Sequence, residues 1–405
     1  MLLLFVEQGI IIKTEREDMG MIKNVTDNVH YVGVDDKTID LFEGQYVVPN
    51  GVSYNSYVIM DDKIAIMDMV DKRKASDWLE NLSQVLGEKK PDYLVISHLE
   101  PDHSANLMDV ITRYPGIQIV SNDKLFGMLP QFFDVDIKDR SVSVKEGDTL
   151  ELGEHTLHFL MAPMVHWPEV MVTYESAEKI LFSADGFGKF GTLDTDEDWA
   201  CEARRYYFNI VGKYGIPVQT LLKKAAAFDI QMICPLHGPI LSENLEYYIG
   251  KYQTWSSYEP EDKGVFIAYA SLHGNTAGAA HDLADMLKAK GVEKVVVSDL
   301  AREDMAECIE DAFRYDRLVV ACPTYDGGIM PVMEDFMYHL KMKAFQKRTV
   351  AIIENGSWAP MAGKLLKEQF LGMKNITVME DMVTIRSTVK ETDRKNLDAL
   401  AEKLK

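Results

Sequence analysis

The sequence has 405 residues, of which 47% are hydrophobic and 10% aromatic, which suits a packed globular protein and excludes a largely disordered one. This length exceeds one ordinary core and predicts two domains, or three small ones. The net charge of −21 argues against non-specific nucleic-acid binding and against docking on an anionic membrane, because both need a basic face.

The four cysteines lie far apart in the sequence and form no C-x-x-C pair. This excludes a zinc ribbon and an in-chain rubredoxin-type iron centre, which both need closely paired thiolates. Their spacing also gives no sign of a secreted disulfide framework, so we expect a reducing, cytoplasmic location.

The N-terminal run MLLLFVEQGIII is apolar but short, and Glu7 and Gln8 interrupt it. No basic residue precedes it and no small-residue cleavage pattern follows, so a signal peptide is not predicted. Met19 and Met21 then open a stretch typical of an ordinary protein start. We expect residues 1–21 to form an N-terminal extension, and the purpose of residues 1–18 stays open.

The next part of the chain contains both short β-rich runs and helical patterns. Several of the runs alternate apolar and polar residues, as strands with one solvent-exposed face do. We expect strands at residues 54–60, 63–69, 92–98, 157–163, 169–175, 179–185 and 231–237, and a helix at residues 77–86. Sheets and helices packed in layers are therefore predicted.

A polar segment, SSYEPEDKG at residues 256–264, separates this part from a regular alternation of strands and helices. We expect strands at residues 265–271, 294–300, 317–323 and 348–355, and helices at residues 276–290, 304–313, 332–340 and 364–370. This order predicts a doubly wound parallel sheet. Two domains are expected, residues 22–260 and residues 261–405.

The segment VISHLEPDHSANL, residues 95–107, places His98, Glu100, Asp102 and His103 directly after an apolar run. On a loop that leaves a strand, such side chains can point into one pocket and serve two adjacent metal ions. A solvated polar turn would have the same composition, so this segment alone does not distinguish a metal site from such a turn.

Three more ligand-type residues, His166, Asp185 and His237, each end an apolar run. One histidine at a strand end is more often structural. Strand ends on one edge of a layered sheet lie together, however, and ligands collect there. The three residues together with residues 98–103 favour a metal site.

The order H-x-E-x-D-H followed by His, Asp and His resembles the metallo-β-lactamase superfold, whose usual signature is H-x-H-x-D-H. Glu100 stands where the middle histidine is usual, an exchange typical of the flavodiiron protein family. The resemblance implies an N-terminal αββα domain with two irons. It implies that one iron is bound by His98, Glu100 and His166, the other by Asp102, His103 and His237, and that Asp185 bridges them.

The additional carboxylate makes such a site harder and more anionic, which favours redox-capable iron, although ligand type alone also permits manganese or zinc. Trp167 and Glu169, beside His166, are candidates for orienting that histidine. Tyr206 or Tyr207 corresponds to a segment that approaches the site in relatives, but two adjacent tyrosines more often indicate packing.

The segment SLHGNTAG, residues 271–278, follows a predicted strand and leads into a helix. Its hydroxyls, amide and glycine suit a phosphate nest at a helix N-terminus, although plain capping residues look alike. Two glycine-bearing loops with an aromatic residue, residues 322–331 and 354–360, follow the third and fourth strands. Ligands of open α/β sheets bind at these carboxyl ends.

The three loops resemble those with which flavodoxin binds FMN. Tyr325 and Trp358 are then expected near the isoalloxazine ring, where backbone amides near Asp326 and Gly327 would tune it, although Trp358 could be a core residue instead. The residues expected to bind FMN are Ser271, His273, Gly274, Asn275, Thr276, Pro323, Thr324, Tyr325, Asp326, Gly327, Asn355, Gly356, Trp358 and Ala359.

The flavodiiron resemblance extends from about residue 22 to the C-terminus and implies an oxidoreductase with FMN and two irons. Two electrons stored on FMN and two on the irons would make four, which suffice to reduce dioxygen to two waters. Two electrons suffice to reduce two nitric oxide molecules to nitrous oxide and water. The sequence ends at Lys405 without the rubredoxin domain of some members. A separate donor is therefore expected, which is rubredoxin, another small carrier or reduced deazaflavin.

The resemblance also implies a head-to-tail homodimer, or a tetramer of such dimers, in which each flavin faces the irons of the partner. Two other functions stay open. One is a dinuclear metal hydrolase with an electron-transfer flavodoxin module, since the superfold also hosts zinc hydrolases. The other is an electron carrier with a vestigial metal site. Glu100 argues against the first, and the complete set of seven ligands against the second.

Overall fold

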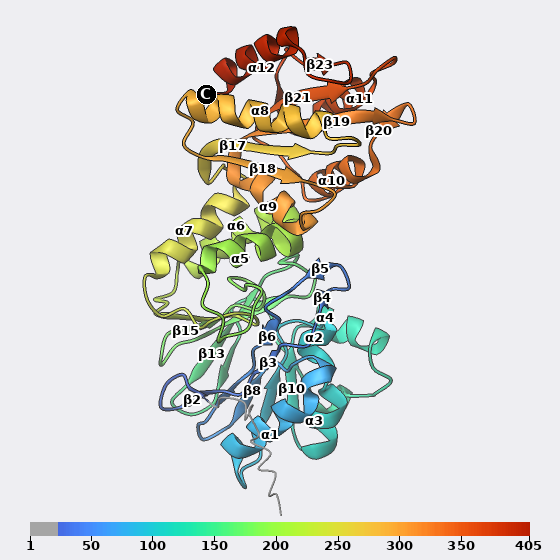
Figure 1. Cartoon of the computed structure of the whole chain (residues 1–405). Helices are drawn as coiled ribbons and strands as arrows, with labels where there is room; N and C mark the ends of the chain where they lie inside the picture. The colour runs from blue at the N-terminus through green and yellow to red at the C-terminus, as the bar shows by residue number, and fades with distance from the viewer. Residues whose placement is uncertain (1–22) are drawn as a thin grey trace, which may run out of the picture.

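The structure is a computed structural model that describes residues 23–405, so the predicted extension at residues 1–21 lies outside the described residues. Two sheets of the N-terminal domain lie at the bottom of Figure 1 and the sheet of the C-terminal domain lies at the top. Four helices lie between them: α5 (Trp199–Tyr206), α6 (Gly215–Ala225), α7 (Leu245–Ser256) and α9 (Met305–Arg314).

The N-terminal domain contains a seven-stranded and a five-stranded sheet. The first has the order β1 (Lys23–Asn24), β2 (Val29–Tyr31), β7 (Tyr57–Ile59), β8 (Ala65–Met67), β9 (Tyr93–Val95), β10 (Gln118–Ser121) and β11 (Ser141–Ser143). The second has the order β12 (Thr149–Glu151), β13 (Thr156–Met161), β14 (Met171–Glu175), β15 (Ile180–Phe182) and β16 (Met232–Cys234).

Alternating side chains explain how the two sheets stack. Tyr57 and Ile59 of β7 belong to a core with Phe159 and Met171 of the other sheet, whereas Val58 between them belongs to a core that includes helix residues. Helices α1 (Ala75–Leu86) and α3 (Leu107–Arg113) supply part of that second core. The predicted αββα layering is confirmed.

The expected strand at residues 54–60 is wrong as a single element. The chain forms β6 (Val52–Tyr54), which pairs with β3 (Val34–Asp36), and then β7 in the seven-stranded sheet. Between them, the Asn55 N–H donates to the Leu236 carbonyl and the Ser56 hydroxyl donates to the Asp68 carbonyl, each at 2.8 Å. These bonds to distant loops replace the strand pairing.

The C-terminal sheet is parallel, in the order β18 (Val295–Asp299), β17 (Asp262–Tyr269), β19 (Tyr315–Tyr325), β21 (Thr349–Asn355) and β22 (Thr377–Val378). Further along the chain, β23 (Val383–Ile385) pairs with the end of β21, and β20 (Gly328–Ile329) pairs antiparallel with the end of β19. The second strand in sequence lies outside the first, as in a flavodoxin-like doubly wound fold.

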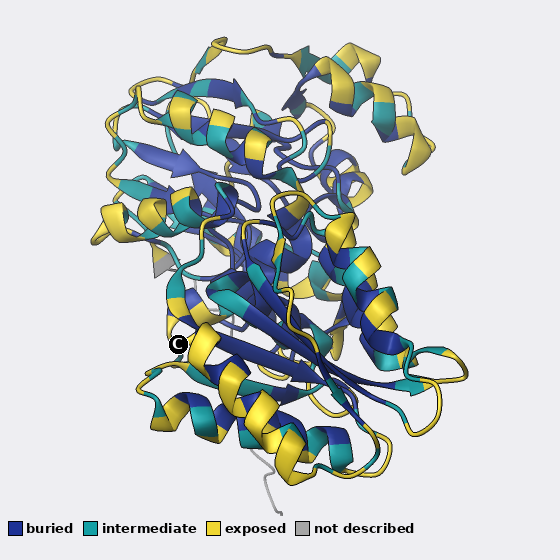
Figure 2. Cartoon of the chain, turned by 90° about the horizontal axis from the view of Figure 1, so that it is seen from above, coloured by how far each residue is buried: buried dark blue, intermediate teal, exposed yellow. Residues whose placement is uncertain are grey.

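Helices cover both faces of this sheet. One face packs against α8 (Asn275–Ala289) and α12 (Glu391–Leu404), and the other against α9, α10 (Pro331–Met342) and α11 (Ala362–Leu371). In Figure 2 the strands are mostly buried, while the outward faces of the helices are exposed. The sequence analysis predicted α8 to α11 but not α12.

Smaller elements include β4 (Leu41–Phe42), β5 (Tyr46–Val47), α2 (Pro101–Ser104), α4 (Asp123–Met128) and a π-helical turn at Tyr207–Val211. Within residues 23–405, none of the helices combines the length and the apolar character that crossing a membrane requires.

Charged side chains join α5 to the C-terminal domain. Arg204 donates to both oxygens of Glu261, at 2.8 and 3.0 Å, and to Glu310 of α9 at 2.7 Å. Lys251 and Trp255 also donate to Glu261, each at 2.6 Å. Against the effect of burial, these hydrogen bonds lower the pKa of Glu261 to about 2, whereas burial raises the pKa of Glu310 to about 8.

The two acids should therefore differ in their effect on stability. Glu261→Gln is expected to lower the free energy of unfolding by about 3–5 kcal/mol, because it leaves the buried Arg204 without its ionised partner. Glu310→Gln should cost less, about 1.5 kcal/mol or below, because burial already disfavours the charged form of Glu310 and Arg204 keeps both of its bonds to Glu261 in this variant. Chemical denaturation of both variants tests this difference, and equal losses would contradict it.

Candidate metal centre

The seven predicted metal ligands lie where strands of the two N-terminal sheets end. His98 follows β9, and Glu100 immediately precedes the short helix α2. The other five are Asp102 and His103 in α2, His166 between β13 and β14, Asp185 after β15 and His237 after β16. Because β8 to β10 are parallel and β15 and β16 are parallel, several of these ends share one edge.

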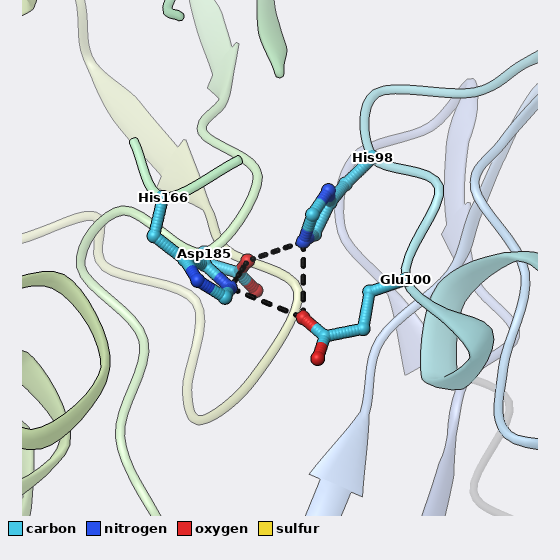
Figure 3. A group of neighbouring side chains, drawn as sticks. All are labelled: His98, Glu100, His166 and Asp185. Atoms are coloured by element: carbon cyan, nitrogen blue, oxygen red, sulfur yellow. Dashed lines mark hydrogen bonds and ion pairs between the residues drawn. The ribbon is translucent and has the colours of Figure 1, made fainter. Parts of the chain in front are cut away.

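The structure brings all seven residues together in two adjacent groups. One group contains His98, Glu100, His166 and Asp185, which point toward one another in Figure 3. The other group contains Asp102, His103 and His237. Within each group, one potential ligand atom per residue lies within 4.8 Å of all the others.

Distances in the first group suit ligands of one metal ion. His98 Nε2 lies 3.1 Å from Glu100 Oε2, and His166 Nε2 lies 3.1 Å from the same oxygen. Two atoms that bind one ion at about 2.1 Å lie roughly 3.0–3.4 Å apart in octahedral or tetrahedral geometry. The side chains thus need little movement to accept an ion.

Asp185 faces both groups at once. Its Oδ2 atom lies 3.3 Å from His98 Nε2 and 3.4 Å from His166 Nε2. Its Oδ1 atom lies 3.3 Å from His103 Nε2 and 3.7 Å from His237 Nε2. One carboxylate that presents one oxygen to each group has the geometry of a ligand shared by two ions.

Several of these atoms are buried without a hydrogen-bond partner. They include both carboxylate oxygens of Asp102 and Asp185, both ring nitrogens of His103, and Nε2 of His237. Leaving one buried polar group unpaired costs about 1–3 kcal/mol, so such a cluster is costly unless something else satisfies it. Cations that bind these atoms would remove this cost, and the donor set fits two of them.

The charges of the centre point the same way. Burial opposes ionisation, yet Asp185 and Glu100 raise the pKa of His98 well above its usual value. The pKa of His166 rises to about 9 beside the same carboxylates, and the histidines hold the pKa of Asp185 well below its usual range. The carboxylates thus create a strong preference for positive charge, which metal ions satisfy by displacing the protons.

The Nδ1 atoms of two histidines are held by neighbours that fix their rings. His98 Nδ1 donates to Glu169 Oε1 at 2.8 Å, and His237 Nδ1 donates to the Ser53 carbonyl at 2.8 Å. Nε2 of each ring therefore faces the centre. The structure differs from the sequence-based expectation here, because Glu169 orients His98 and not the neighbouring His166.

The Trp167 ring lies edge-on to the rings of both His98, at 5.1 Å between centroids, and His166, at 6.2 Å. It therefore packs beside the centre, and its expected role in orienting His166 stays a prediction.

The sequence analysis missed Asp68, which follows β8. Its carboxylate accepts a 2.6 Å hydrogen bond from the Ser97 N–H and so fixes the start of the loop that carries His98. Burial raises the pKa of Asp68 to about 6. The sequence does contain a signal, since Asp68 is a lone acidic residue inside the apolar run IAIMDMV at residues 64–70.

The two adjacent tyrosines have different surroundings. The Tyr206 ring lies 5.6 Å from that of His237 and is buried beside the centre, where burial and the carboxylates of Asp185 and Asp102 raise its pKa well above the usual value. The Tyr207 ring packs among Tyr252 and other aromatic residues instead. Only Tyr206 lies against one of the seven ligands.

An apolar cavity of about 170 Å³ lies behind two of the ligand loops. Val165, which precedes His166, and Gly186 and Phe187, which follow Asp185, contribute to its lining. Most of the remaining lining consists of aliphatic side chains of the five-stranded sheet, α6 and α7. An apolar cavity of this size suits small apolar molecules.

The predicted phosphate loop leads into α8. Ser271 Oγ accepts hydrogen bonds from Gly274 N–H at 3.1 Å and from Ala277 N–H at 3.3 Å. Gly274 has φ 86°, a conformation that favours glycine. His273 is exposed and Asn275 half-buried, whereas Thr276 is buried.

The other two predicted flavin loops are tied together. Thr324 Oγ1 accepts from the Met361 and Ala362 N–H groups, at 2.8 and 3.1 Å, just beyond the second loop. Asp326 and Gly327, with φ 48° and 73°, form the tight turn between β19 and β20. Pro323 is buried, Gly356 half-buried and Ala359 exposed.

Two further flavin-loop residues differ in exposure. The Asn355 side chain is buried and exchanges two hydrogen bonds with the Ser387 backbone, both at 2.9 Å. Trp358 is 90% exposed and Tyr325 42% exposed. Trp358 is therefore not a core residue, and two aromatic rings are accessible at this edge of the sheet.

Comparison with known proteins identifies both domains. The model of the ODP family beta lactamases matches residues 52–238, and the flavodoxin model matches residues 267–398. The nitric oxide reductase of Moorella thermoacetica is 28% identical over 390 residues, which cover 94% of this chain and 97% of that protein.

Solved structures agree along nearly the whole chain. The rubredoxin oxygen:oxidoreductase of Desulfovibrio gigas is 26% identical with a TM-score of 0.88, covering 95% of this chain and 98% of that one. The flavodiiron protein of Giardia intestinalis, at 23% identity and a TM-score of 0.87, covers 95% and 96% respectively and shares the fold.

The hydrogen bond from His98 to Glu169 allows a direct test of how the centre is positioned. Glu169→Ala is expected to weaken metal binding about 10–100-fold, because the His98 ring loses the partner that fixes its orientation. The same substitution at the exposed Glu151 should leave metal binding unchanged. Metal content after dialysis against graded chelator measures both, and equal retention would exclude a positioning role for Glu169.

Proposed function

This chain belongs to the flavodiiron protein family, and we propose that it reduces dioxygen to water, nitric oxide to nitrous oxide, or both. The observation that carries the proposal is the position of Asp185, which presents one oxygen to each of two ligand groups. A dinuclear centre and a flavodoxin-like sheet in one chain suit the multi-electron reduction of a small molecule. They suit the two alternative functions, a metal hydrolase and a simple electron carrier, less well.

Each ligand has a proposed role. One iron would be held by His98, Glu100 and His166, the other by Asp102, His103 and His237, with Asp185 between them. Glu100 adds a hard, anionic oxygen where zinc hydrolases of this superfold use a histidine, which favours iron. Buried Nε2 atoms and carboxylates supply the rest of the donor set.

FMN would lie beyond the carboxyl ends of β17, β19 and β21, where loops 271–278, 322–331 and 354–360 meet. The Ser271 loop and the N-terminus of α8 would face the phosphate, and Tyr325 and Trp358 would flank the flavin ring. When bound, the flavin supplies stored electrons and the two irons supply the reducing centre for the gas.

Other residues of the chain prepare the centre for this reaction. Glu169 and the Ser53 carbonyl hold two histidine rings in place, and burial limits access of water. Tyr206 keeps its proton at neutral pH, because its pKa is raised, and since it alone of the two tyrosines lies against a ligand it is the better candidate for a hydrogen-bond donor. The apolar cavity beside the ligand loops suits apolar diatomic gases.

Exposed apolar side chains support a partner at the flavin edge. Leu272, Tyr325 and Trp358 are 45%, 42% and 90% exposed. We place there the iron centre of a second copy, in a head-to-tail homodimer or a tetramer of such dimers. Rubredoxin is proposed as the electron donor, with another small carrier or reduced deazaflavin as the alternative.

We further propose that residues 22–260 and 261–405 are the two domains and that the protein works in the cytoplasm. The unpaired state of Cys201, Cys234, Cys308 and Cys322 is compatible with a reducing compartment.

Anaerobic stopped-flow measurements test the reaction. The iron-loaded, fully reduced protein is mixed separately with dioxygen and with nitric oxide, and flavin and iron reoxidation are followed by absorbance. Rapid reoxidation without hydrogen peroxide marks an oxygen reductase, and rapid reoxidation that releases nitrous oxide marks a nitric oxide reductase. Slow reoxidation of the iron-loaded protein by both gases, together with zinc in the protein as isolated and esterase activity of that zinc form, would favour the hydrolase.

Glu100 provides a test of metal choice. Glu100→His should raise the zinc-to-iron ratio of protein loaded from an equimolar mixture of both ions by about 10-fold or more, since a nitrogen ligand replaces the hard carboxylate. Glu151→His, at an exposed position, is the matched control and should leave the ratio unchanged. Elemental analysis measures both ratios. An unchanged ratio in Glu100→His would contradict the conclusion that the hard carboxylate of Glu100 favours iron.

A further inference from the structure

A third cluster of ligand-type side chains lies in the N-terminal domain, away from the metal centre. His155 stands in the turn between β12 and β13, Glu175 is the last residue of β14, and Glu178 stands in the turn between β14 and β15. One potential ligand atom from each of the three lies within 4.8 Å of the other two. Since β13, β14 and β15 are antiparallel, these turns lie at the end of the sheet opposite to His166 and Asp185.

His155 presents a buried nitrogen that has no hydrogen-bond partner. The residue is 2% exposed, and its Nε2 atom is unpaired, as is the buried Oε2 atom of Glu178. Nε2 lies 3.6 Å from Glu178 Oε1, which is too long for a good hydrogen bond. Two ligands of one tetrahedral zinc ion lie about 3.3 Å apart, so this spacing is close to that of atoms sharing an ion.

Asp61, in the turn between β7 and β8, fixes the His155 ring. Its Oδ2 atom accepts hydrogen bonds from His155 Nδ1 and from the His155 backbone N–H, both at 2.8 Å. Nε2 is therefore directed away from Asp61. A carboxylate that binds the far nitrogen of a histidine in this way is a common companion of metal ligation.

The close approach of Asp61 depends on Gly153. A Cβ atom at this position, where φ is 148°, would lie only 2.3 Å from Asp61 Oδ1. The Glu175 side chain is held too, because its two oxygens accept from the Ala177 and Glu178 N–H groups at 2.6 and 2.8 Å. Carboxylate oxygens retain a second lone pair in such bonds. The three ligand groups are thus largely pre-positioned.

We propose that His155, Glu175 and Glu178 bind one divalent transition-metal ion, for which zinc is the best candidate. Zinc accepts one imidazole and two carboxylates, with water in the fourth position. The ion would link the two turns of the five-stranded sheet, and through Asp61 it would also tie them to the seven-stranded sheet. This site is independent of the proposed gas reduction.

The test uses the iron-loaded, full-length protein. The protein is equilibrated with zinc chloride, passed through a desalting column and analysed for zinc and iron in the same sample. One zinc ion per chain is expected in addition to an unchanged iron content. X-ray absorption spectra at the zinc edge of this sample should show one imidazole among oxygen ligands, which is the ligand set of the cluster.

Two variants and one control locate the ion. His155→Gln and Glu178→Gln should each weaken the additional zinc binding at least 10-fold. His158→Gln, three residues further along, should retain it, because His158 belongs to no candidate ligand group. Glu178 is partly exposed, so its variant remains informative if His155→Gln does not fold.

Three results would overturn the proposal. The first is no additional zinc in the unaltered protein, which would leave His155 with Asp61 and Glu178 as ion-pair partners and no bound ion. The second is zinc uptake matched by iron loss, which would place the zinc in the main centre. The third is zinc retained by both variants.

Discussion

The shared carboxylate of Asp185 is the interaction on which the centre depends. A single buried group approaches four histidines, two through each oxygen, so both ligand groups are defined relative to it. Its position comes directly from the fold, since it follows β15, the neighbour of the edge strand β16 in the five-stranded sheet. The parallel neighbour β16 brings His237 to the same edge, and the facing sheet brings His98 and His103. Stacking of two sheets thus assembles ligands that are up to 139 residues apart in sequence.

The chemistry of this arrangement follows from burial. Carboxylates and imidazoles that approach to between 3.1 and 3.7 Å in the interior have strongly shifted pKa values, and several keep unsatisfied atoms. Such a cluster lowers the stability of the fold unless it binds something, so its presence indicates a functional site. The same reasoning applies to His155, where a single unpaired nitrogen in a well-packed turn marks a smaller site.

Much of this was predictable from the sequence, for physical reasons. Strand ends are visible as apolar runs that stop at polar residues, and all seven ligands lie at or near such stops. The alternation of strands and helices likewise predicted the C-terminal sheet. The role of Glu169 was not predictable, because its partner His98 is distant in sequence and proximity suggested His166. The interruption of the expected strand at Asn55 and Ser56 was not predictable either, since their hydrogen-bond partners are carbonyls of loops distant in sequence.

The helix α5 adds a constraint that links the two domains. Its residue Arg204 binds Glu310 of the C-terminal domain, while Tyr206, two positions later, packs against His237 of the metal centre. In addition, the Phe208 ring stacks on that of Phe313 of α9 at 4.2 Å between centroids. One short segment therefore contacts both the metal centre and the flavodoxin-like domain through buried groups. Hinge closure within one chain would have to break these buried contacts, and this supports the proposal that electrons come from the flavin of a second copy.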